Sequence, residues 1–455
     1  MLSFICVHEN FVNFVREHVL PAKGDDFMEL KPIGVSNRLF YYLNGGENSA
    51  FDACFRFDFK EETQEELLSA AIAKALQSFP EFAFRPVLHE GTVWAAKNEA
   101  PVPLLHEEAA PLCYGTEETN GYIFAFRALK KGFVFSNFHG LSDFYGTWIF
   151  LNTVLYHYAL GKGLAAQPFE GIRLTPDAAM GEMEQLDPYR YFREESPKTE
   201  MPAAFAIPET PYAPEDPRCA SYELRCPLKD FLAAAKAHKA SAGAFLALTA
   251  AKAVDALYEA GDEPIVVMMP ADMRQCYQTR TMVNFSDATF LRYDEKLKKL
   301  PPEEQGAAFK QQLKSQVNRE HFAPLIAEKT AAIDGFVHSG MHISQWNQRL
   351  SLPPEGPSPL TIPVTYPGRL DLPVEYGAFV ENVDNQLYFR GMGTFGILGT
   401  TYGDTVHIRS SQRFDSPALM QEMSRELAKA GLSATFHQLP SYQGNQLITK
   451  KLQEV

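Results

Sequence analysis

The residues of this chain whose types and spacing best suit acid–base chemistry are a histidine and an aspartate four positions apart. They are His139 and Asp143, in the stretch FVFSNFHGLSDFYG at 133–146. Imidazole is mostly neutral near pH 7, so His139 can accept a substrate proton if the fold presents its side chain. Asp143 can cap a following helix or pair with a cation. The spacing alone fits either a general base on a turn or an ordinary turn histidine beside an N-cap aspartate.

Other motifs offer weaker chemistry. GMGTFG at 391–396 has the glycine spacing of a dinucleotide site, but the residues after it are typical of a strand rather than the required helix, so we expect tight turns there. His338 and His342 have metal-ligand spacing, yet Gly340 lies between them and no glutamate follows His338. We expect a surface pair on a helix and no metal site. A serine hydrolase has no GxSxG motif to support it.

The composition is typical of a folded globular protein, and the length suits two domains. The chain has 455 residues, of which 45% are hydrophobic and 22% are charged. Its net charge of -14 argues against a nucleic-acid partner, which needs a basic surface. Short basic runs at 127–132 and 296–299 could bind a cofactor phosphate, although such runs are usually solvated surface.

Cysteine spacing and hydropathy place the chain in a reducing compartment. The six cysteines form no CxxC pair, so neither a zinc ribbon nor a redox motif is expected. The first residues lack the basic region of a signal peptide, and the longest nearly apolar run, residues 147–160, is too short to cross a bilayer. We therefore expect a cytoplasmic protein without a membrane partner.

Regular elements are expected on both sides of His139. Residues 51–59 alternate as a half-buried strand, and 63–79 form a helix that begins with a capping box between Thr63 and Glu66. Strands near 121–128 and 132–138 lead to His139, and a helix follows from about residue 143 to 160. The histidine is thus expected on the turn between a buried strand and a helix.

The rest of the chain repeats a mixture of strands and helices after a proline-rich segment. The expected division is a first domain at 1–195, a crossover linker at 196–218 and a second domain at 219–455. Strands are expected at 220–226, 264–269, 361–366, 375–381, 386–391 and 404–411, and helices at 228–239, 241–258, around 303–349 and near 416–430. The fold class is α/β.

The stretch from Phe133 through the following helix resembles the HxxxD region of the chloramphenicol-acetyltransferase-like acyltransferase superfamily. Other segments follow in the family's order. The strand and helix at 51–86 resemble its opening, 266–293 resembles its P.D.R and GN segment with Arg274 and Asn284 at the matching places, and IPVTYPGRLDLP resembles a later strand near the active-site channel. The resemblance implies two similar domains with mixed sheets flanked by helices, which enclose a central channel. It is nearest to the alcohol acetyltransferase and condensation-domain branches.

The resemblance also implies an activity. His139 would act as a general base when an alcohol or amine acceptor attacks an acyl thioester, without an acyl-enzyme. Asp143 would be structural and paired with Arg274, and Thr365 is the candidate hydrogen-bond donor to the tetrahedral intermediate. The expected donor is acyl-coenzyme A as a co-substrate, with no tightly bound cofactor, and an acyl carrier protein is the alternative donor. A monomer is expected, because the two-domain plan holds the whole site.

The sequence departs from the family pattern at two places, and the one at residue 144 keeps a non-catalytic binding or scaffolding relative open as an alternative. Phe138 stands where many members have a second histidine, and Phe144 stands where a glycine usually follows the aspartate; glycine arrives only at Gly146. A bulky residue at 144 would narrow the channel wall. The DFGWG motif of the plant-type branch is absent, so a plant-type member is not expected.

Overall fold

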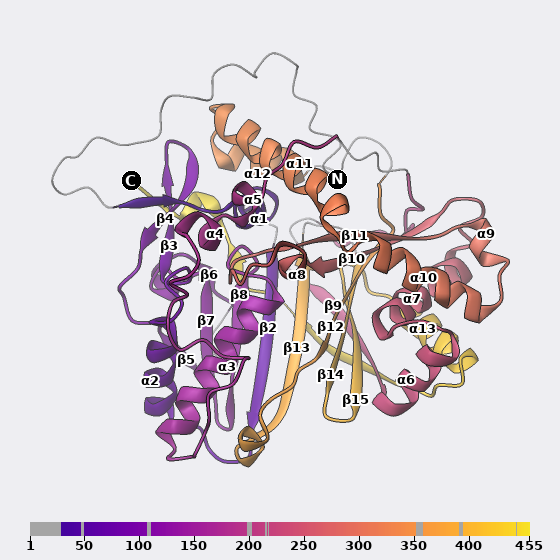
Figure 1. Ribbon diagram of the computed structural model, residues 1–455, viewed down its shortest axis with the longest axis horizontal. Helices are drawn as coiled ribbons and strands as arrows, with labels where there is room; N and C mark the ends of the chain where they lie inside the picture. The colour runs from indigo at the N-terminus through magenta and orange to yellow at the C-terminus, as the bar shows by residue number, and fades with distance from the viewer. Residues whose placement is uncertain are drawn as a thin grey trace.

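The chain folds into two α/β lobes that lie side by side (Figure 1). The structure is a computed structural model, and the residues that it describes are 29–46, 50–106, 111–197, 203–213, 216, 218–351, 358–390, 395–442 and 444–455.

The first lobe is built on a five-stranded sheet. Its strand order is β13 (Val380–Arg390), β2 (Ala50–Phe59), β8 (Gly132–Phe138), β7 (Phe124–Leu129) and β5 (Leu104–His106). Apolar residues alternate along β2, as predicted for 51–59, because one face of the strand packs against α3 (Phe144–Gly161). Phe57 stacks on Trp148 of that helix, and Phe59 stacks on Tyr158. Helix α2 (Glu65–Leu76) packs against α3.

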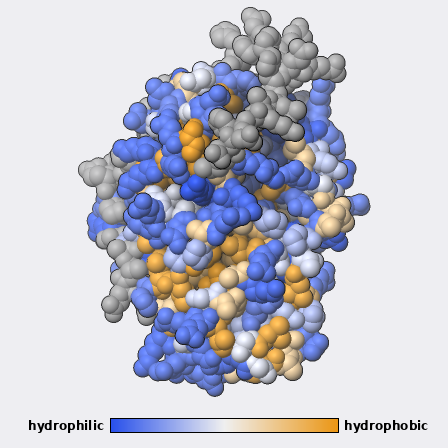
Figure 2. Space-filling view, turned by 90° about the vertical axis from the view of Figure 1, so that its left-hand side faces the viewer, coloured by the Kyte–Doolittle hydropathy of each residue, from blue (hydrophilic) through white to orange (hydrophobic). Residues whose placement is uncertain are grey.

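Smaller sheets and several helices complete this lobe. One sheet contains β1 (Leu30–Pro32), β4 (Thr92–Lys97), β3 (Phe84–His89) and β18 (Gln453–Glu454), and another pairs β17 (Gln446–Leu447) with β6 (Cys113–Tyr114). The helices are α1 (Val35–Asn44), α4 (Glu182–Leu186), α5 (Pro188–Tyr191), α11 (Arg319–His338) and α12 (Ile343–Ser351), with short 3₁₀ turns at Glu117–Thr119, Val374–Ala378 and Thr449–Lys451. The outer face of the lobe is largely hydrophilic around a central hydrophobic area (Figure 2).

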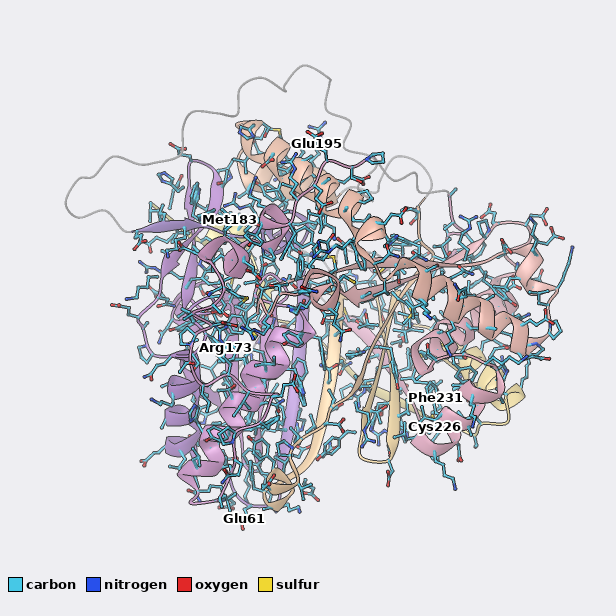
Figure 3. All side chains as sticks on the ribbon, viewed as in Figure 1. Glu61, Arg173, Met183, Glu195, Cys226 and Phe231 are labelled. Atoms are coloured by element: carbon cyan, nitrogen blue, oxygen red, sulfur yellow. The ribbon has the colours of Figure 1, made fainter. Side chains whose placement is uncertain are left out.

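The second lobe is built on a seven-stranded mixed sheet. Its order is β11 (Ser286–Tyr293), β10 (Ile265–Asp272), β12 (Ile362–Arg369), β14 (Phe395–Tyr402), β15 (Thr405–Gln412), β9 (Cys219–Pro227) and β16 (Thr435–Tyr442). Its helices are α6 (Leu228–Ala237), α7 (Ala242–Tyr258), α9 (Glu295–Lys298), α10 (Pro302–Gln316) and α13 (Ala418–Lys429). The short α8 (Arg274–Tyr277) follows β10, and its Tyr277 packs in the core of the first lobe. Cys226 of β9 and Phe231 of α6 mark this lobe in Figure 3, and Arg173 marks the first.

Each lobe has its own hydrophobic core, but the cores do not follow the order of the chain. The first core takes residues from β13, α11 and α12 as well as from the first 192 residues, whereas the second draws on 220–269, 291–309, 362–364 and 395–432. Strand β13 pairs along its whole length with β2. The domain boundary expected at 196–218 stays a prediction, and the packing adds that later segments return to the first lobe.

Several predicted elements need correction. The strand predicted at 375–381 is wrong, because Val374–Ala378 form a 3₁₀ turn and β13 begins only at Val380. The predicted capping box is wrong as well: Thr63 donates to the carbonyl of Gly132, at 3.0 Å, and makes no cap at α2, whose N-cap is Gln64. Thr63 thus joins the helix to β8 instead of beginning the helix.

The histidine pair also differs from its prediction. His338 ends α11 and His342 precedes α12, so they do not share a helix, because Gly340 between them has φ +66° and breaks it. The glycines at 391 and 393 lie outside the described residues, but β14 begins at Phe395, which confirms a strand after them. No single described helix is long and apolar enough to cross a membrane; α6 and α7, bent by 78°, reach that length and composition only as a pair.

Candidate active site

His139 lies directly after β8, on a five-residue turn that ends at the N-cap of α3. Its main-chain N–H donates to the carbonyl of Phe51 in β2 at 3.0 Å, and its carbonyl accepts from Asn284 Nδ2 at 2.7 Å. The next two carbonyls, of Gly140 and Leu141, both accept from Asn37 Nδ2 at 2.8 Å. Neighbouring elements therefore hold this part of the turn through main-chain atoms.

The remainder of the turn is fixed from the second half of the chain. Ser142 Oγ donates to the carbonyl of Met282. Gly146, in the first turn of α3, packs so closely on the same segment that a Cβ atom there would lie 2.0 Å from the Met282 carbonyl oxygen. The turn and the segment at 282–285 thus form one rigid unit.

Asp143 forms the N-cap of α3, and both of its oxygens are fully used. Oδ1 accepts from Gly146 N at 3.3 Å and from Arg274 Nη2 at 3.0 Å. Oδ2 accepts from Arg274 Nη1 and from Phe285 N, each at 2.9 Å. The carboxylate has no capacity left for the imidazole of His139, so it fixes the turn rather than the ring.

Each N–H group of the Arg274 guanidinium has a hydrogen-bond acceptor. Besides its two bonds to Asp143, it donates to Asp272 Oδ1 and to the carbonyls of Thr281 and Val283, at 2.8–2.9 Å. All five guanidinium N–H groups are therefore satisfied. Burial lowers the pKa of Arg274, but the charges of Asp143 and Asp272 outweigh that effect and raise it. The guanidinium thus stays charged although both side chains of the pair are almost fully buried.

The imidazole of His139 is half-buried and lies among aromatic rings. Phe40 of α1 stacks on it with ring centroids 4.4 Å apart and planes 11° apart, and Phe51 of β2 contacts it at 4.6 Å and 51°. Nδ1 is buried and has no hydrogen-bond partner among the residues that the structure describes. Burial lowers the pKa of His139, against opposing effects of its own carbonyl, Asp143 and Asn284. The ring is thus held as neutral imidazole.

The other predicted residues lie in different surroundings. Phe144 begins α3, and its ring packs against Phe55 and Trp148, at 5.9 and 6.0 Å, as part of an aromatic cluster. Thr365 lies half-buried in β12, next to an irregularity in the pairing of β12 with β14. No described contact joins it to His139, so its role stays a prediction.

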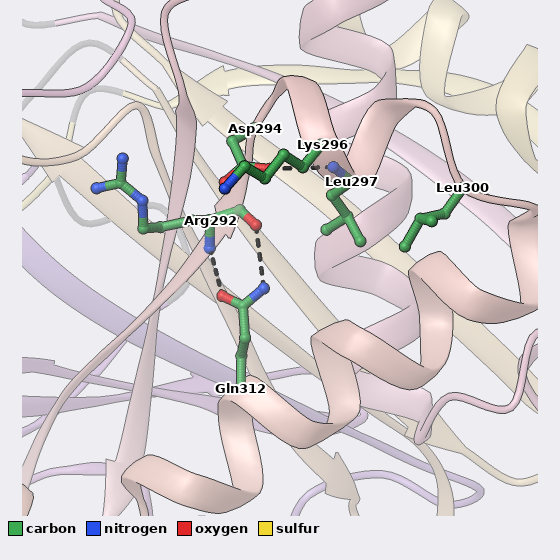
Figure 4. A pocket seen from close by; sticks show the side chains of 6 residues that line it. All are labelled: Arg292, Asp294, Lys296, Leu297, Leu300 and Gln312. Carbon is green, nitrogen blue, oxygen red and sulfur yellow. Dashed lines mark hydrogen bonds between the residues drawn. The ribbon is translucent and has the colours of Figure 1, made fainter.

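The basic run at 296–299 lies in the second lobe, away from His139. Lys298 pairs with Asp255 and Lys299 pairs with Glu295, whereas Lys296 borders an open hollow (Figure 4). The residues lining this hollow are Arg292, Asp294, Lys296, Leu297, Leu300 and Gln312. The run at 127–132 is engaged too, because Lys130 pairs with Glu62 and Lys131 donates to the carbonyl of Lys60. The predicted central channel stays a prediction.

Two residues of the site, Asn37 and Phe40, were not predicted from the sequence, because the helical pattern of α1 was not recognised. The signal was present: Val35, Leu39 and Tyr42 recur at helical spacing and are all buried. Their contact with the His139 turn, about 100 residues away along the chain, has no local signature.

Comparison with known proteins shows similarity of structure but not of sequence. No family model and no curated protein matches the chain. The structure of polyketide synthase associated protein 5 from Mycobacterium tuberculosis superposes with a TM-score of 0.59 at 13% identity, over 88% of this chain and 97% of that one. TRI101 from F. sporotrichioides, complexed with coenzyme A and T-2, gives 0.57 at 12% identity, over 90% and 100%.

A starter condensation domain of rhizomide synthetase RzmA, in complex with C8-CoA and Leu-SNAC, gives 0.57 at 12% identity, over 88% of this chain and 93% of that one. The chain therefore shares its fold with these three proteins over nearly its full length, which confirms the predicted fold class. At these identities the likeness concerns the fold, and the activity has to be argued from the site.

Proposed function

We propose that this protein is an acyltransferase that moves an acyl group from a thioester directly to a hydroxyl or amine acceptor, with His139 as general base. The observation that carries the proposal is the division of tasks at the turn. Asp143 and Arg274 satisfy each other and hold the backbone, whereas Nδ1 of the half-buried imidazole has no hydrogen-bond partner within the described part of the chain. A base must have its ring free for the substrate.

The chemistry follows from the neutral imidazole. Since Nδ1 faces the interior, Nε2 is the nitrogen that would take the proton from the acceptor as its oxygen or nitrogen attacks the thioester carbonyl. The tetrahedral intermediate then expels the thiolate, which receives the proton back from the imidazolium, so that charge and protons balance. A preorganised hydrogen-bond donor would stabilise the intermediate, and Thr365 remains our candidate.

Coenzyme A is the donor carrier that we favour. Two structures of the same fold, TRI101 and the RzmA starter condensation domain, hold coenzyme A or C8-CoA. An acyl carrier protein that delivers the thioester is the alternative. All groups described at the site come from one chain, so a monomer would suffice.

The test follows release of free thiol from acetyl-, butyryl- and longer acyl-coenzyme A with a panel of alcohols and amines. His139→Ala should lower acceptor-dependent release by about 10²–10⁴-fold, because general-base catalysis contributes that much, with little effect on stability. His157→Ala, at another half-buried histidine, serves as the control and should retain activity. Release that survives His139→Ala would exclude His139 as the base.

The pH dependence gives an independent test. Because the pKa of His139 lies below its ordinary 6.5, the acidic limb of the kcat/KM profile, along which the ring takes up a proton, should be centred below pH 6.5. An acidic limb centred at or above pH 6.5 would contradict this assignment.

A second candidate is a binding or scaffolding role without turnover. The observation in its favour is Phe144, whose ring lies beside Phe55 and Trp148 immediately after Asp143. The absence of thiol release with coenzyme A donors, and then with carrier-protein donors, would favour this candidate over the acyltransferase.

A further inference from the structure

The imidazole of His139 belongs to a cluster of three rings drawn from three elements. Phe40 comes from α1, Phe51 from β2, and His139 follows β8. The two phenylalanine rings lie 5.4 Å apart, and each contacts the imidazole. The near-parallel stack of Phe40 on His139, at 4.4 Å and 11°, is the contact that defines the plane of the imidazole.

Hydrogen bonds fix the backbone of His139, whereas its ring has only the interactions with its own carbonyl and Asn284 that oppose the lowering of its pKa. Its N–H and C=O are bonded to Phe51 and Asn284. The oxygens of Asp143 are occupied by four other donors, and Nδ1 has no partner among the described residues. In many sites a carboxylate or carbonyl bonded to one ring nitrogen sets the orientation of the other. Here Nδ1 has no such bond among the described residues, and the stacked ring of Phe40 takes the larger part of that task.

We propose that Phe40 is a positioning residue for His139: its stacked ring holds the imidazole in a single orientation and keeps water from one face. The catalytic consequence rests on the proposed function, whereas the orientation and hydration of the ring do not.

The imidazole of His139 has few charged groups around it. The carboxylate of Asp143, at the start of α3, is the one charge that shifts the pKa of His139, and Arg274 compensates it. Asn284 is uncharged, and Phe40 of α1 and Phe51 of β2 contact the ring with apolar side chains. Burial is the main cause of the lowered pKa. Removal of the Phe40 ring should therefore let water reach the imidazole and raise its pKa toward the ordinary value.

The first experiment measures the ring itself by NMR titration of ¹³C-labelled histidine, with the His139 signal identified from His139→Ala. Phe40→Leu should raise the pKa of His139, and Phe40→Tyr, which keeps a ring, should leave it near the wild-type value. Phe84→Leu, at another half-buried phenylalanine of the first core, should leave it unchanged. If Phe40→Leu does not fold, Phe40→Met takes its place. An equal pKa of His139 in wild type and in Phe40→Leu would overturn the proposal.

The second experiment measures turnover. Phe40→Leu should lower kcat by about 10- to 100-fold, the cost of a misplaced catalytic group, with a smaller change in KM and a shift of the acidic limb of the pH profile. Phe40→Tyr should restore most of the rate. Unchanged kcat in Phe40→Leu would overturn the positioning role. If wild type shows no turnover while the NMR shift appears, the proposed function fails and the packing role of Phe40 stands.

Discussion

At the scale of single residues, His139 and Asp143 have different tasks: Asp143 holds the turn in place, and His139 presents its ring. Asp143 accepts four hydrogen bonds and Arg274 donates five, so each is saturated by buried partners. His139 takes no part in that network, and its ring is left with aromatic neighbours. The aspartate is therefore an anchor of the turn, and under the proposed function the histidine would carry the chemistry.

Asp143→Asn should be strongly destabilising. It removes the main charge partner of a buried guanidinium and turns an amide N–H toward a donor, so we expect a loss of about 3–5 kcal/mol of unfolding free energy. Urea unfolding at pH 7 measures the change. Asp177→Asn is the matched control, because its partner Arg280 is largely exposed, and it should cost under about 1 kcal/mol. Equal losses in the two variants would mean that the buried pair adds no special stability.

At the scale of elements, the position of the site depends on close contact between the start of α3 and the segment at 282–285. Asp143 caps the helix, and Gly146 lets the Met282 carbonyl approach it. A glycine in the first turn lowers the intrinsic stability of a helix. Gly146 is nevertheless present because the Met282 carbonyl lies too close for a larger residue.

Gly146→Ala tests this approach. The new Cβ would lie 2.0 Å from a backbone oxygen and 2.3 Å from Ser142 Oγ, so the helix or the segment must shift. We expect a loss of at least about 1–3 kcal/mol and reduced turnover. Gly335→Ala in α11 is the control: its Cβ would meet nothing within 4 Å, and it should stabilise by about 0.5–1 kcal/mol. Thermal unfolding of both variants measures the two effects. A higher Tm for Gly146→Ala than for wild type would contradict the expected clash with the Met282 carbonyl.

At the scale of the whole molecule, β13 connects the lobes, because it pairs with β2 on one side and bonds to the second sheet on the other. Gln386 donates to Ser221 Oγ at 2.7 Å, and Arg409 of β15 reaches both Asp384 and the carbonyl of Asn385. Arg409 also pairs with the fully buried Glu223, which bonds to His407 Nδ1 at 2.8 Å. An ionic network thus lies along the junction of the two sheets.

Acid should weaken this network through Glu223. Burial raises its pKa, but His407, Arg409 and Arg225 more than reverse that and bring it to about 2. A depressed carboxyl pKa stabilises the fold above the unfolded value of about 4.5, and this contribution, at most about 3 kcal/mol, is lost as pH falls toward 2.

Urea unfolding from pH 7 down to pH 3 tests this expectation. Glu223→Gln should be least stable relative to wild type at pH 7, and the difference should shrink as the solution becomes more acidic. Exposed Glu304→Gln should follow the wild-type curve at every pH. A difference for Glu223→Gln that does not change with pH would contradict the assignment.

Local sequence patterns were enough to predict the elements that carry the site. The period of two at 51–59, the apolar strand at 132–138 and the helix after Asp143 are local patterns, and local patterns are written in neighbouring residues. The same stretch drew attention to His139 and Asp143, and its resemblance to a known motif placed Arg274 as the partner of Asp143.

Tertiary structure alone decided what surrounds the imidazole. The contact of Asp143 with Arg274 spans 131 positions, that of Asn37 with Gly140 spans 103, and β13 joins a sheet whose neighbouring strand lies more than 300 residues earlier. The stacking of Phe40 on His139 is a contact of the same long-range kind. Such contacts form because distant apolar and polar groups are buried together, and the free energy of that burial depends on the three-dimensional arrangement rather than on spacing along the chain.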